Sequence, residues 1–263
     1  MKKFHVLTNT DKDPELKISG RISDYLKSKG CTCTVQTDMY EKQEFIPDDS
    51  ECVIVLGGDG TMIRVADLIR GRKPIIGVNL GTLGFLQEVE ASDVEEMLDR
   101  LINDEYKIER RMMLKGNDRV ALNDIVVSRK GSLKILYLNI YVNDMLLCNY
   151  KADGIVISTP TGSTAYNLSA GGPIVEPCAE AILITPICPH NLGARTIVLS
   201  PEDTVKIEVV PGRCEAEATF DGGAEIALGG GAVIEIAKAD IYTDILKIGK
   251  ENFIEVLSRK MND

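Results

Sequence analysis

The sequence predicts an α/β N-terminal domain with a parallel sheet, followed by a mostly antiparallel all-β domain. In roughly the first 110 residues, short apolar segments alternate with helical patterns, which is typical of strand–helix–strand units. After about Met112, strand-like segments follow one another with little helix between them. Near the end, Phe253, Ile254 and Leu257 predict a helix that packs back on the first domain. The expected parts are residues 1–112, 113–243 and 244–263.

Helical patterns separate the short apolar runs of the first domain. One helix is expected to have Asp13 as its N-cap and Pro14 as its first helical residue, and to end at Gly30. Ser92 and Glu95 form a capping box ahead of another helix. Because helices connect the strands, the sheet should be parallel. The strands predicted here are 4–8, 31–36, 52–56 and 75–79.

Tight turns and short strands characterise the second domain. The segment Val142-Asn143-Asp144-Met145 predicts a hairpin, because Asn and Asp tolerate the positive φ angles that such turns need. Strands joined in this way pair antiparallel. The strands predicted here are 120–127, 136–142, 145–150, 155–158, 181–185, 196–199, 205–210, 215–220 and 232–236.

The composition limits the classes of function. The 263 residues carry a net charge of −10, which argues against nucleic acid as the main partner, because phosphate backbones require clustered Lys and Arg. No apolar run approaches the roughly 20 residues of a membrane-spanning helix, and no signal-peptide pattern is present. We therefore expect a cytoplasmic chain that does not bind membranes. Seven cysteines without a Cys-x-x-Cys pair predict free thiols rather than structural zinc.

The stretch Gly57-Gly58-Asp59-Gly60-Thr61 is predicted to bind phosphate. It joins an apolar strand to a helical pattern, and its glycines let a ligand approach the backbone because no Cβ intervenes. The unpaired first amides of a helix, together with its dipole, favour an anion. We therefore expect Gly57, Gly58, Gly60 and Thr61 to contact phosphate.

Asp59 is the exception in this turn, because a carboxylate repels a phosphate. It would have to accept a proton, bind a metal ion or hold a hydroxyl group. The structural alternative is a plain turn in which Asp59 is only a favourable charge at a helix N-terminus, worth ~0.3–1 kcal/mol. The residues around Asp59 leave both readings open.

A second polar region runs from Asp153 to Asn167 and again follows an apolar strand. Its small hydroxylated residues suit a base edge or a phosphate, and Tyr166 adds an aromatic face. Upstream, Asn123 and Asp124 lie inside a predicted apolar strand. A polar pair there costs free energy unless it is hydrogen-bonded or used by a ligand.

These motifs, taken in order, resemble those of the NAD kinases, which phosphorylate the 2′-hydroxyl of the adenosine ribose of NAD to make NADP. The first motif is also similar to diacylglycerol, sphingolipid and phosphofructokinase-type kinases, whereas the run Ser158–Tyr166 is much more specific. The resemblance covers most of the chain. The matching blocks are Gly57–Thr61, Asn79–Leu86, Asn123-Asp124 and Asp153–Tyr166.

The resemblance implies a role for each matched residue. Asp59 is expected to orient or deprotonate the ribose 2′-hydroxyl, and the glycines around it to bind the phosphates of ATP or polyphosphate. Mg²⁺ or another divalent cation is expected with the donor, without assigned protein ligands, and the family implies a homodimer or homotetramer. Where the family usually has Glu, this chain has the shorter Asp124. The residues expected to contact NAD are Phe85, Asn123, Asp124, Asp153, Thr161, Thr164, Ala165, Tyr166 and Asp221.

Two other functions remain open on the sequence. A lipid kinase of the diacylglycerol or sphingoid type would share the Gly-Gly-Asp-Gly block but would not need the Thr161–Tyr166 run. A non-catalytic NAD(P)-binding sensor would keep the pocket and lose the chemistry. The chain has neither a P-loop lysine motif nor the protein-kinase motifs, so glycine amides and Mg²⁺ are expected to supply most of the positive field.

Overall fold

A computed structural model describes residues 1–37, 46–81, 84–131, 134–191, 193–212, 214–249 and 252–262. The chain forms two compact units. Unit 1 comprises Met1–Arg110 and Thr243–Asp263, and unit 2 comprises Arg111–Tyr242. Within the predicted block Asn79–Leu86, Thr82 and Leu83 lie outside the described residues.

Unit 1 is built on a parallel sheet, as predicted. Its strands are β1 (Lys3–Thr8), β2 (Thr32–Gln36), β3 (Cys52–Gly57) and β4 (Ile75–Asn79), in the order β2-β1-β3-β4. The short β5 (Val89–Glu90) and the end of β17 (Val233–Lys247) also pair with β4 in parallel. The order reverses direction between β1 and β3, and in sheets of this type ligands bind beyond the carboxyl ends of the strands at that point.

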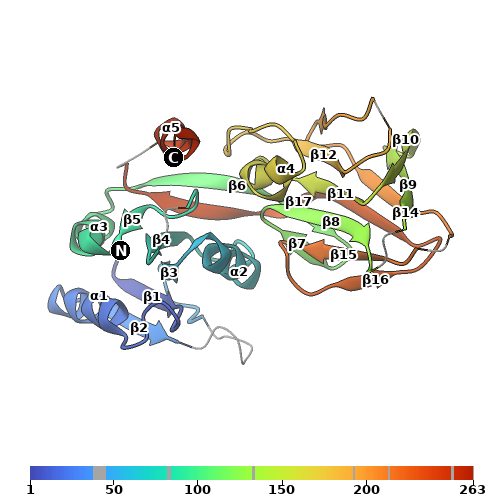
Figure 1. Cartoon of the computed structure of the whole chain (residues 1–263). Helices are drawn as coiled ribbons and strands as arrows, with labels where there is room; N and C mark the ends of the chain where they lie inside the picture. The colour runs from blue at the N-terminus through green and yellow to red at the C-terminus, as the bar shows by residue number, and fades with distance from the viewer. Residues whose placement is uncertain are drawn as a thin grey trace. The chain divides into compact units, whose positions relative to one another are not determined.

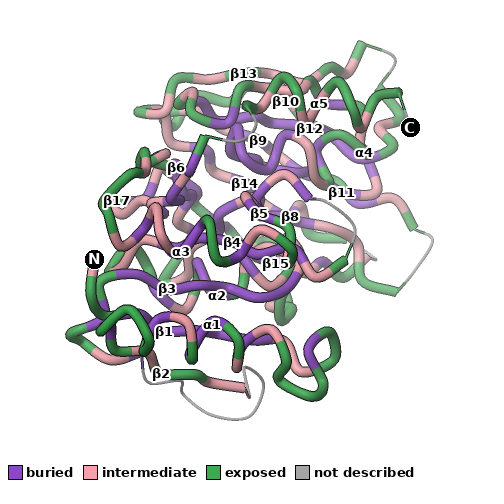
Figure 2. Tube along the Cα trace, turned by 90° about the vertical axis from the view of Figure 1, so that its left-hand side faces the viewer, coloured by how far each residue is buried: buried purple, intermediate pink, exposed green. Residues whose placement is uncertain are grey.

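Helices cover the sheet of unit 1 (Figure 1). They are α1 (Lys17–Ser28), α2 (Asp59–Ile69), α3 (Val94–Ile102) and α5 (Phe253–Asn262), with a 3₁₀ turn, η1 (Ala91–Asp93), before α3. Helices α2 and α3 each bury one apolar stripe, which in α3 consists of Val94, Met97, Leu98 and Leu101, whereas the buried face of α1 also includes two serines. Strand β3 is buried along its whole length (Figure 2).

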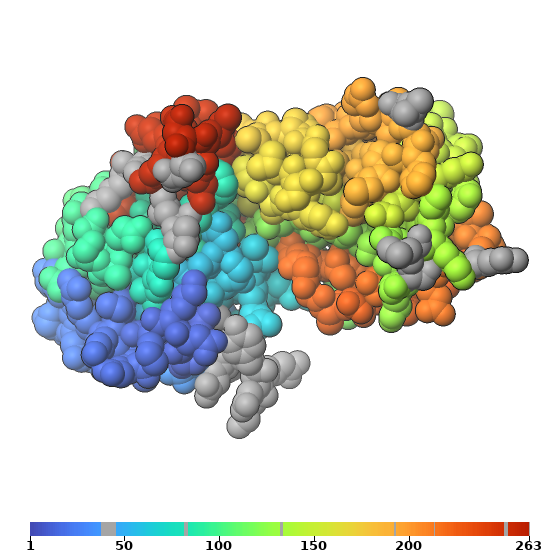
Figure 3. Space-filling model, in the orientation of Figure 1, coloured from blue at the N-terminus to red at the C-terminus, as the bar shows by residue number. Residues whose placement is uncertain are grey.

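The C-terminal helix returns to unit 1, which confirms the prediction. The ring of Phe253 lies 6.1 Å from the ring of Phe85, measured between centroids. None of the described residues of α5 is fully buried, and the helix is seen in red on the surface in Figure 3. It therefore packs on unit 1 without entering its core.

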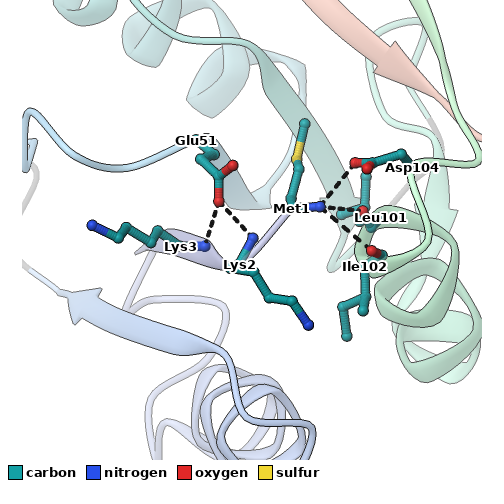
Figure 4. A network of polar contacts seen from close by, with 7 residues as sticks. All are labelled: Met1, Lys2, Lys3, Glu51, Leu101, Ile102 and Asp104. Atoms are coloured by element: carbon teal, nitrogen blue, oxygen red, sulfur yellow. Dashed lines mark hydrogen bonds and ion pairs between the residues drawn. The ribbon is translucent and has the colours of Figure 1, made fainter.

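The first strand of unit 1 is held at its amino end. The Met1 ammonium donates hydrogen bonds to the carbonyls of Leu101 and Ile102 and pairs with Asp104 at 2.8 Å (Figure 4). These carbonyls belong to the C-terminal turn of α3, where a positive charge is favoured. The Glu51 carboxylate accepts the amides of residues 2–3, which ties β1 to the start of β3 (Figure 4).

Two predicted helix starts were wrong in detail. Helix α1 begins at Lys17 rather than Pro14, yet the buried Asp13 carboxylate still accepts the amides of Ile18 (3.1 Å) and Ser19 (3.0 Å). The capping box at Ser92 does not form, because the Ser92 hydroxyl donates to Asp93 and no side chain caps α3. The residues after Asp13 reach its carboxylate through a turn that sequence spacing does not show.

Unit 2 is an antiparallel β structure, as predicted. One sheet has the order β10-β9-β14-β17 and the other the order β13-β12-β11-β8-β15-β16, and their facing side chains form one apolar core. Two short helical segments, η2 (Thr161–Thr164) and α4 (Tyr166–Ser169), follow β11. The remaining bounds are β6 Lys107–Gly116, β7 Arg119–Ala121, β8 Asp124–Arg129, β9 Leu136–Val142, β10 Met145–Ala152, β11 Gly154–Ser158, β12 Ile182–Ile187, β13 Ile197–Leu199, β14 Val205–Val209, β15 Ala216–Phe220 and β16 Ile226–Leu228.

The predicted hairpin at Asn143 and Asp144 is confirmed, with φ angles of 48° and 63° between β9 and β10. The single strand predicted over 120–127 is instead two strands, β7 and β8, with a break at Leu122 and Asn123. The strand predicted over 232–236 is the start of β17, which continues to Lys247.

We expect Asp13→Ala to lower the free energy of unfolding by about 2 kcal/mol, because it leaves helix-start amides without an acceptor in a buried place. Urea unfolding followed by circular dichroism measures this. The matched control is Asp11→Ala in the same loop, where the side chain is exposed and should matter little. Equal destabilisation by the two substitutions would contradict the assigned capping role.

Candidate functional site

The glycine turn of unit 1 joins β3 to α2. Gly58 precedes the first helical residue in an extended conformation, and the Thr61 amide donates to the Gly58 carbonyl at 2.9 Å. Among the described residues, the amides of residues 58–60 have no acceptor, so they are free to donate hydrogen bonds to a ligand. The Thr61 amide is therefore not available for the phosphate contact that the sequence predicted for this residue. The Thr61 side chain occupies the space that a side chain on Gly57 would need.

Asp59 does not cap its own helix. Its carboxylate turns to the loop after β4, where one oxygen accepts the Phe85 amide at 2.8 Å and the other the Leu86 amide at 3.0 Å. A methyl group on Gly84 would overlap this carboxylate, so only glycine leaves room for it. Each carboxylate oxygen keeps acceptor capacity beyond its one amide. The two loops thus hold Asp59 in one orientation while leaving it able to accept a proton.

Two further side chains approach this turn without having been predicted from the sequence. The Gln87 side-chain oxygen accepts the Gly84 amide at 2.9 Å, and the Lys12 ammonium lies close to Gly58. Neither residue belongs to a recognisable motif, and Lys12 lies on a different loop, after β1. Only the fold brings them to the glycine turn.

Phe85 presents a partly buried ring beside the turn. Helix α5 lies against it, since Phe253 packs on the ring and the Lys260 ammonium lies 5.0 Å from its centroid. A cation over an aromatic face is attracted by the ring quadrupole. The C-terminal helix therefore fixes the side chain that the family resemblance placed beside the adenosine of NAD.

In unit 2, Asp221 holds the break between β7 and β8. One carboxylate oxygen accepts the Leu122 amide at 2.7 Å, and the other accepts those of Asn123 (2.7 Å) and Asp124 (3.1 Å). Asp221 itself has a φ of 51°, which is unusual for a residue other than glycine. Asp221, itself a predicted NAD contact, thus holds the backbone of two further predicted contacts, Asn123 and Asp124.

Asp124 is a buried carboxyl group with an altered proton affinity. Burial, and secondly the charge of Asp221, raise the pKa of Asp124 to about 7. Both causes disfavour the charged form. This group therefore changes its protonation close to neutral pH.

The hydroxylated run after β11 is hydrogen-bonded to the break between β7 and β8. The Thr159 hydroxyl donates to the Leu122 carbonyl at 2.6 Å, and the Thr159 amide to the Asn123 carbonyl at 2.8 Å. A side chain on Gly162 would overlap the Asn123 backbone. The structure thus brings together two blocks that lie far apart in the sequence.

The residues predicted to contact adenine lie on η2 and at the start of α4. The Thr161 hydroxyl is buried and has no hydrogen-bond partner among the described residues, and Tyr166 is 44% exposed. Thr164 and Ala165 are partly buried between them. An unpaired hydroxyl and an exposed ring are groups that a ligand can use.

The Asn167 side chain stabilises this turn through hydrogen bonds. Its amide group donates to the carbonyls of Ser163 and Pro173, both at 3.0 Å, and accepts the Thr185 hydroxyl at 2.6 Å. It is fully buried and is a structural residue.

Asp153 pairs with a positively charged side chain. The Arg129 guanidinium contacts its two carboxylate oxygens at 2.9 and 3.4 Å. The pair is partly exposed at the start of β11.

Within the described residues, no group of three or more His, Cys, Asp or Glu side chains could hold a metal ion. No helix in the described part of the chain is long and apolar enough to cross a membrane.

The chain matches two models of one family. Residues 4–106 match the ATP-NAD kinase N-terminal domain, and residues 122–248 match the ATP-NAD kinase C-terminal domain. A relative named NAD kinase, from Agathobacter rectalis, is 43% identical over 100% of this chain and 99% of its own.

Solved structures agree with these matches. An NAD kinase from Archaeoglobus fulgidus in complex with ATP is 26% identical, with a TM-score of 0.83 over 99% of this chain and 98% of that one. The yeast NADH kinase complexed with NADH shares the fold, with 22% identity and a TM-score of 0.86 over 100% of this chain and 88% of that one. The chain therefore belongs to the ATP-NAD kinase family.

Proposed function

We propose that Asp59 orients and deprotonates the 2′-hydroxyl of the adenosine ribose of NAD, in the reaction by which NAD kinases use ATP to make NADP. The chain is an NAD kinase, and this excludes the lipid kinase and the non-catalytic sensor as alternatives. The observation that carries the role of Asp59 is its carboxylate, held by the amides of Phe85 and Leu86. A general base must be fixed within hydrogen-bond reach of the proton it takes.

The donor phosphates are proposed to bind at the amides of residues 58–60. These amides lie at the N-terminus of α2, where the helix dipole also favours negative charge. The donor is ATP, and we propose that polyphosphate can replace it. We propose that Mg²⁺ accompanies the donor, because it is usually held by substrate phosphates, water and one or two carboxylates. When bound, it would neutralise phosphate charge.

NAD is proposed to bind through residues of unit 2. The unpaired Thr161 hydroxyl and the exposed Tyr166 ring supply a donor or acceptor and a stacking surface for adenine. Asn123 and Asp124 would contact the dinucleotide from the break that Asp221 holds. We also propose a homodimer or homotetramer, in which Asp153 lies near the second half of the dinucleotide.

We expect Asp59→Asn to lower kcat for NADP formation by about 10²–10⁴-fold, because it removes the base. The new amide would also face one of the two backbone amides, donor against donor. NADP is followed with an NADP-specific dehydrogenase in the presence of NAD, ATP and Mg²⁺. The control is Asp67→Asn on the same helix, an exposed carboxylate that pairs with Arg70. Near-normal turnover of Asp59→Asn would remove Asp59 from the mechanism.

Gly84→Ala tests the placement of Asp59 without changing any reacting group. The added methyl overlaps the Asp59 carboxylate and also the Gln87 side-chain oxygen, and both must move, so we expect kcat to fall by about 10²-fold or more. Gly20→Ala on α1 is the control, since a methyl there meets open space. Wild-type kcat in Gly84→Ala would show that the observed Asp59 position is not the working one.

The Asp124 carboxyl should make stability depend on pH. Its pKa is raised from 3.8 to about 7 in the folded chain, so its protonated form favours folding, and this contribution is lost as pH rises from about 4 to about 7. Asp124→Asn should therefore be more stable relative to wild type at about pH 8 than at about pH 5. Urea unfolding at the two pH values measures the difference. An identical difference at both would mean that Asp124 is not titrating there.

A further inference from the structure

The loop after β1 places Lys12 at the carboxyl edge of the unit 1 sheet. The Asn9 amide donates to the Leu56 carbonyl at 3.1 Å, which ties this loop to the end of β3. The amides of Lys12 and Asp13 both donate to the Asn9 carbonyl at 3.0 Å, and Asp13 is fixed by the start of α1. The backbone of Lys12 is therefore anchored on both sides.

The Lys12 ammonium lies over two glycine-containing loops at once. A methyl group placed on Gly58 or on Gly81 would lie 3.2 Å from Lys12 Nζ in either case. Gly58 follows β3 and Gly81 follows β4, so the ammonium spans the ends of two adjacent strands. The side chain is exposed, and no carboxylate or carbonyl within the described part of the chain pairs with its ammonium.

The Gln87 side-chain amide is a second donor without an acceptor near Gly58, besides the Lys12 ammonium. Gln87 is 5% exposed, and its Nε2 has no hydrogen-bond acceptor among the described residues. The amide cannot simply be flipped, because the Gln87 oxygen accepts the Gly84 amide at 2.9 Å. A methyl group on Gly58 would lie 3.9 Å from this Nε2. A buried donor without an acceptor is costly, so this one points to a missing acceptor.

Several donors around Gly58 have no acceptor among the described residues. They are Lys12 Nζ, Gln87 Nε2 and the amides of residues 58–60, and the nearby Asp59 carboxylate is already bound by two amides. An occupant must offer several acceptor oxygens and negative charge, which describes a phosphate chain. Because the Lys12 side chain is exposed and unpaired, it can move outward to let an oxygen reach Nε2.

We propose that Lys12 and Gln87 bind the phosphate chain of the donor, with the Lys12 ammonium supplying the charge that a P-loop lysine supplies in other kinases. This rests on the proposed function, since it names further binding groups at the donor site. The chemistry recognised is a chain of linked phosphates, from either a nucleoside triphosphate or an inorganic polyphosphate. Lys12 also offsets the repulsion between Asp59 and the donor.

The test is direct binding of tripolyphosphate and of ATP, each with Mg²⁺, by isothermal titration calorimetry. Lys12→Ala should raise the Kd of tripolyphosphate and of ATP about tenfold or more, while the NAD affinity stays within twofold of wild type. The matched control is Lys2→Ala, which removes the same charge from the opposite, amino end of β1. Unchanged binding of both ligands by Lys12→Ala would overturn the proposal. So would weakened binding of ATP alone, because Lys12 would then contact the nucleoside.

Gln87→Glu is the second variant. It replaces the unsatisfied Nε2 by an oxygen of similar size and keeps the acceptor for the Gly84 amide. Tripolyphosphate should bind at least tenfold more weakly, and urea unfolding checks that the fold persists; wild-type binding would remove Gln87 from the site. These are binding measurements and do not depend on turnover. If the wild-type protein made no NADP, the role proposed for Asp59 would be contradicted, but phosphate binding by Lys12 and Gln87 could still be tested.

Discussion

The hydrogen bonds from the Phe85 and Leu86 amides to the Asp59 carboxylate are the interaction on which the unit 1 site depends. They join the loops that follow β3 and β4, two strands paired in parallel with Gly57 opposite Asn79. Gly84 must lack a side chain for these bonds to form, and Gln87 holds the Gly84 amide. A carboxylate that would otherwise rotate freely is thereby preorganised, as the base role proposed for Asp59 requires.

In unit 2, a carboxylate again accepts backbone amides, but there it stabilises an irregular stretch of backbone. The Asp221 carboxylate accepts consecutive backbone amides and so stabilises an irregular break in a strand, where those groups would lack partners. The break then carries Asn123 and receives the hydroxyl and amide of Thr159. This arrangement disfavours the charged form of Asp124, whose carboxyl is buried close to the Asp221 charge and keeps its proton up to about neutral pH.

Local sequence patterns predicted the secondary structure well and the hydrogen-bond partners poorly. The alternation of strands and helices, the antiparallel second unit and the Asn143-Asp144 turn follow from periodicity and turn chemistry, which act over a few residues. The capping box at Ser92 failed because a competing contact with Asp93 was available. The long continuation of β17 depends on a partner strand that no local pattern reveals.

The Gly57–Thr61 turn, which we propose to bind phosphate, stands out in the sequence because its glycines and helix start are contiguous, whereas Lys12 and Gln87 reach Gly58 only through the order of the strands. The same limit applies to Asp221 and Leu122, which are 99 residues apart. Residue types at a site were thus visible in the sequence, and their mutual positions required the fold.

The central claim, that two backbone amides hold Asp59, is tested most directly by amide hydrogen exchange. In the wild-type protein the Phe85 and Leu86 amides should exchange slowly, and in Asp59→Ala both should exchange much faster while the amides of β3 are unaffected. Unchanged exchange at Phe85 and Leu86 in Asp59→Ala would contradict the account.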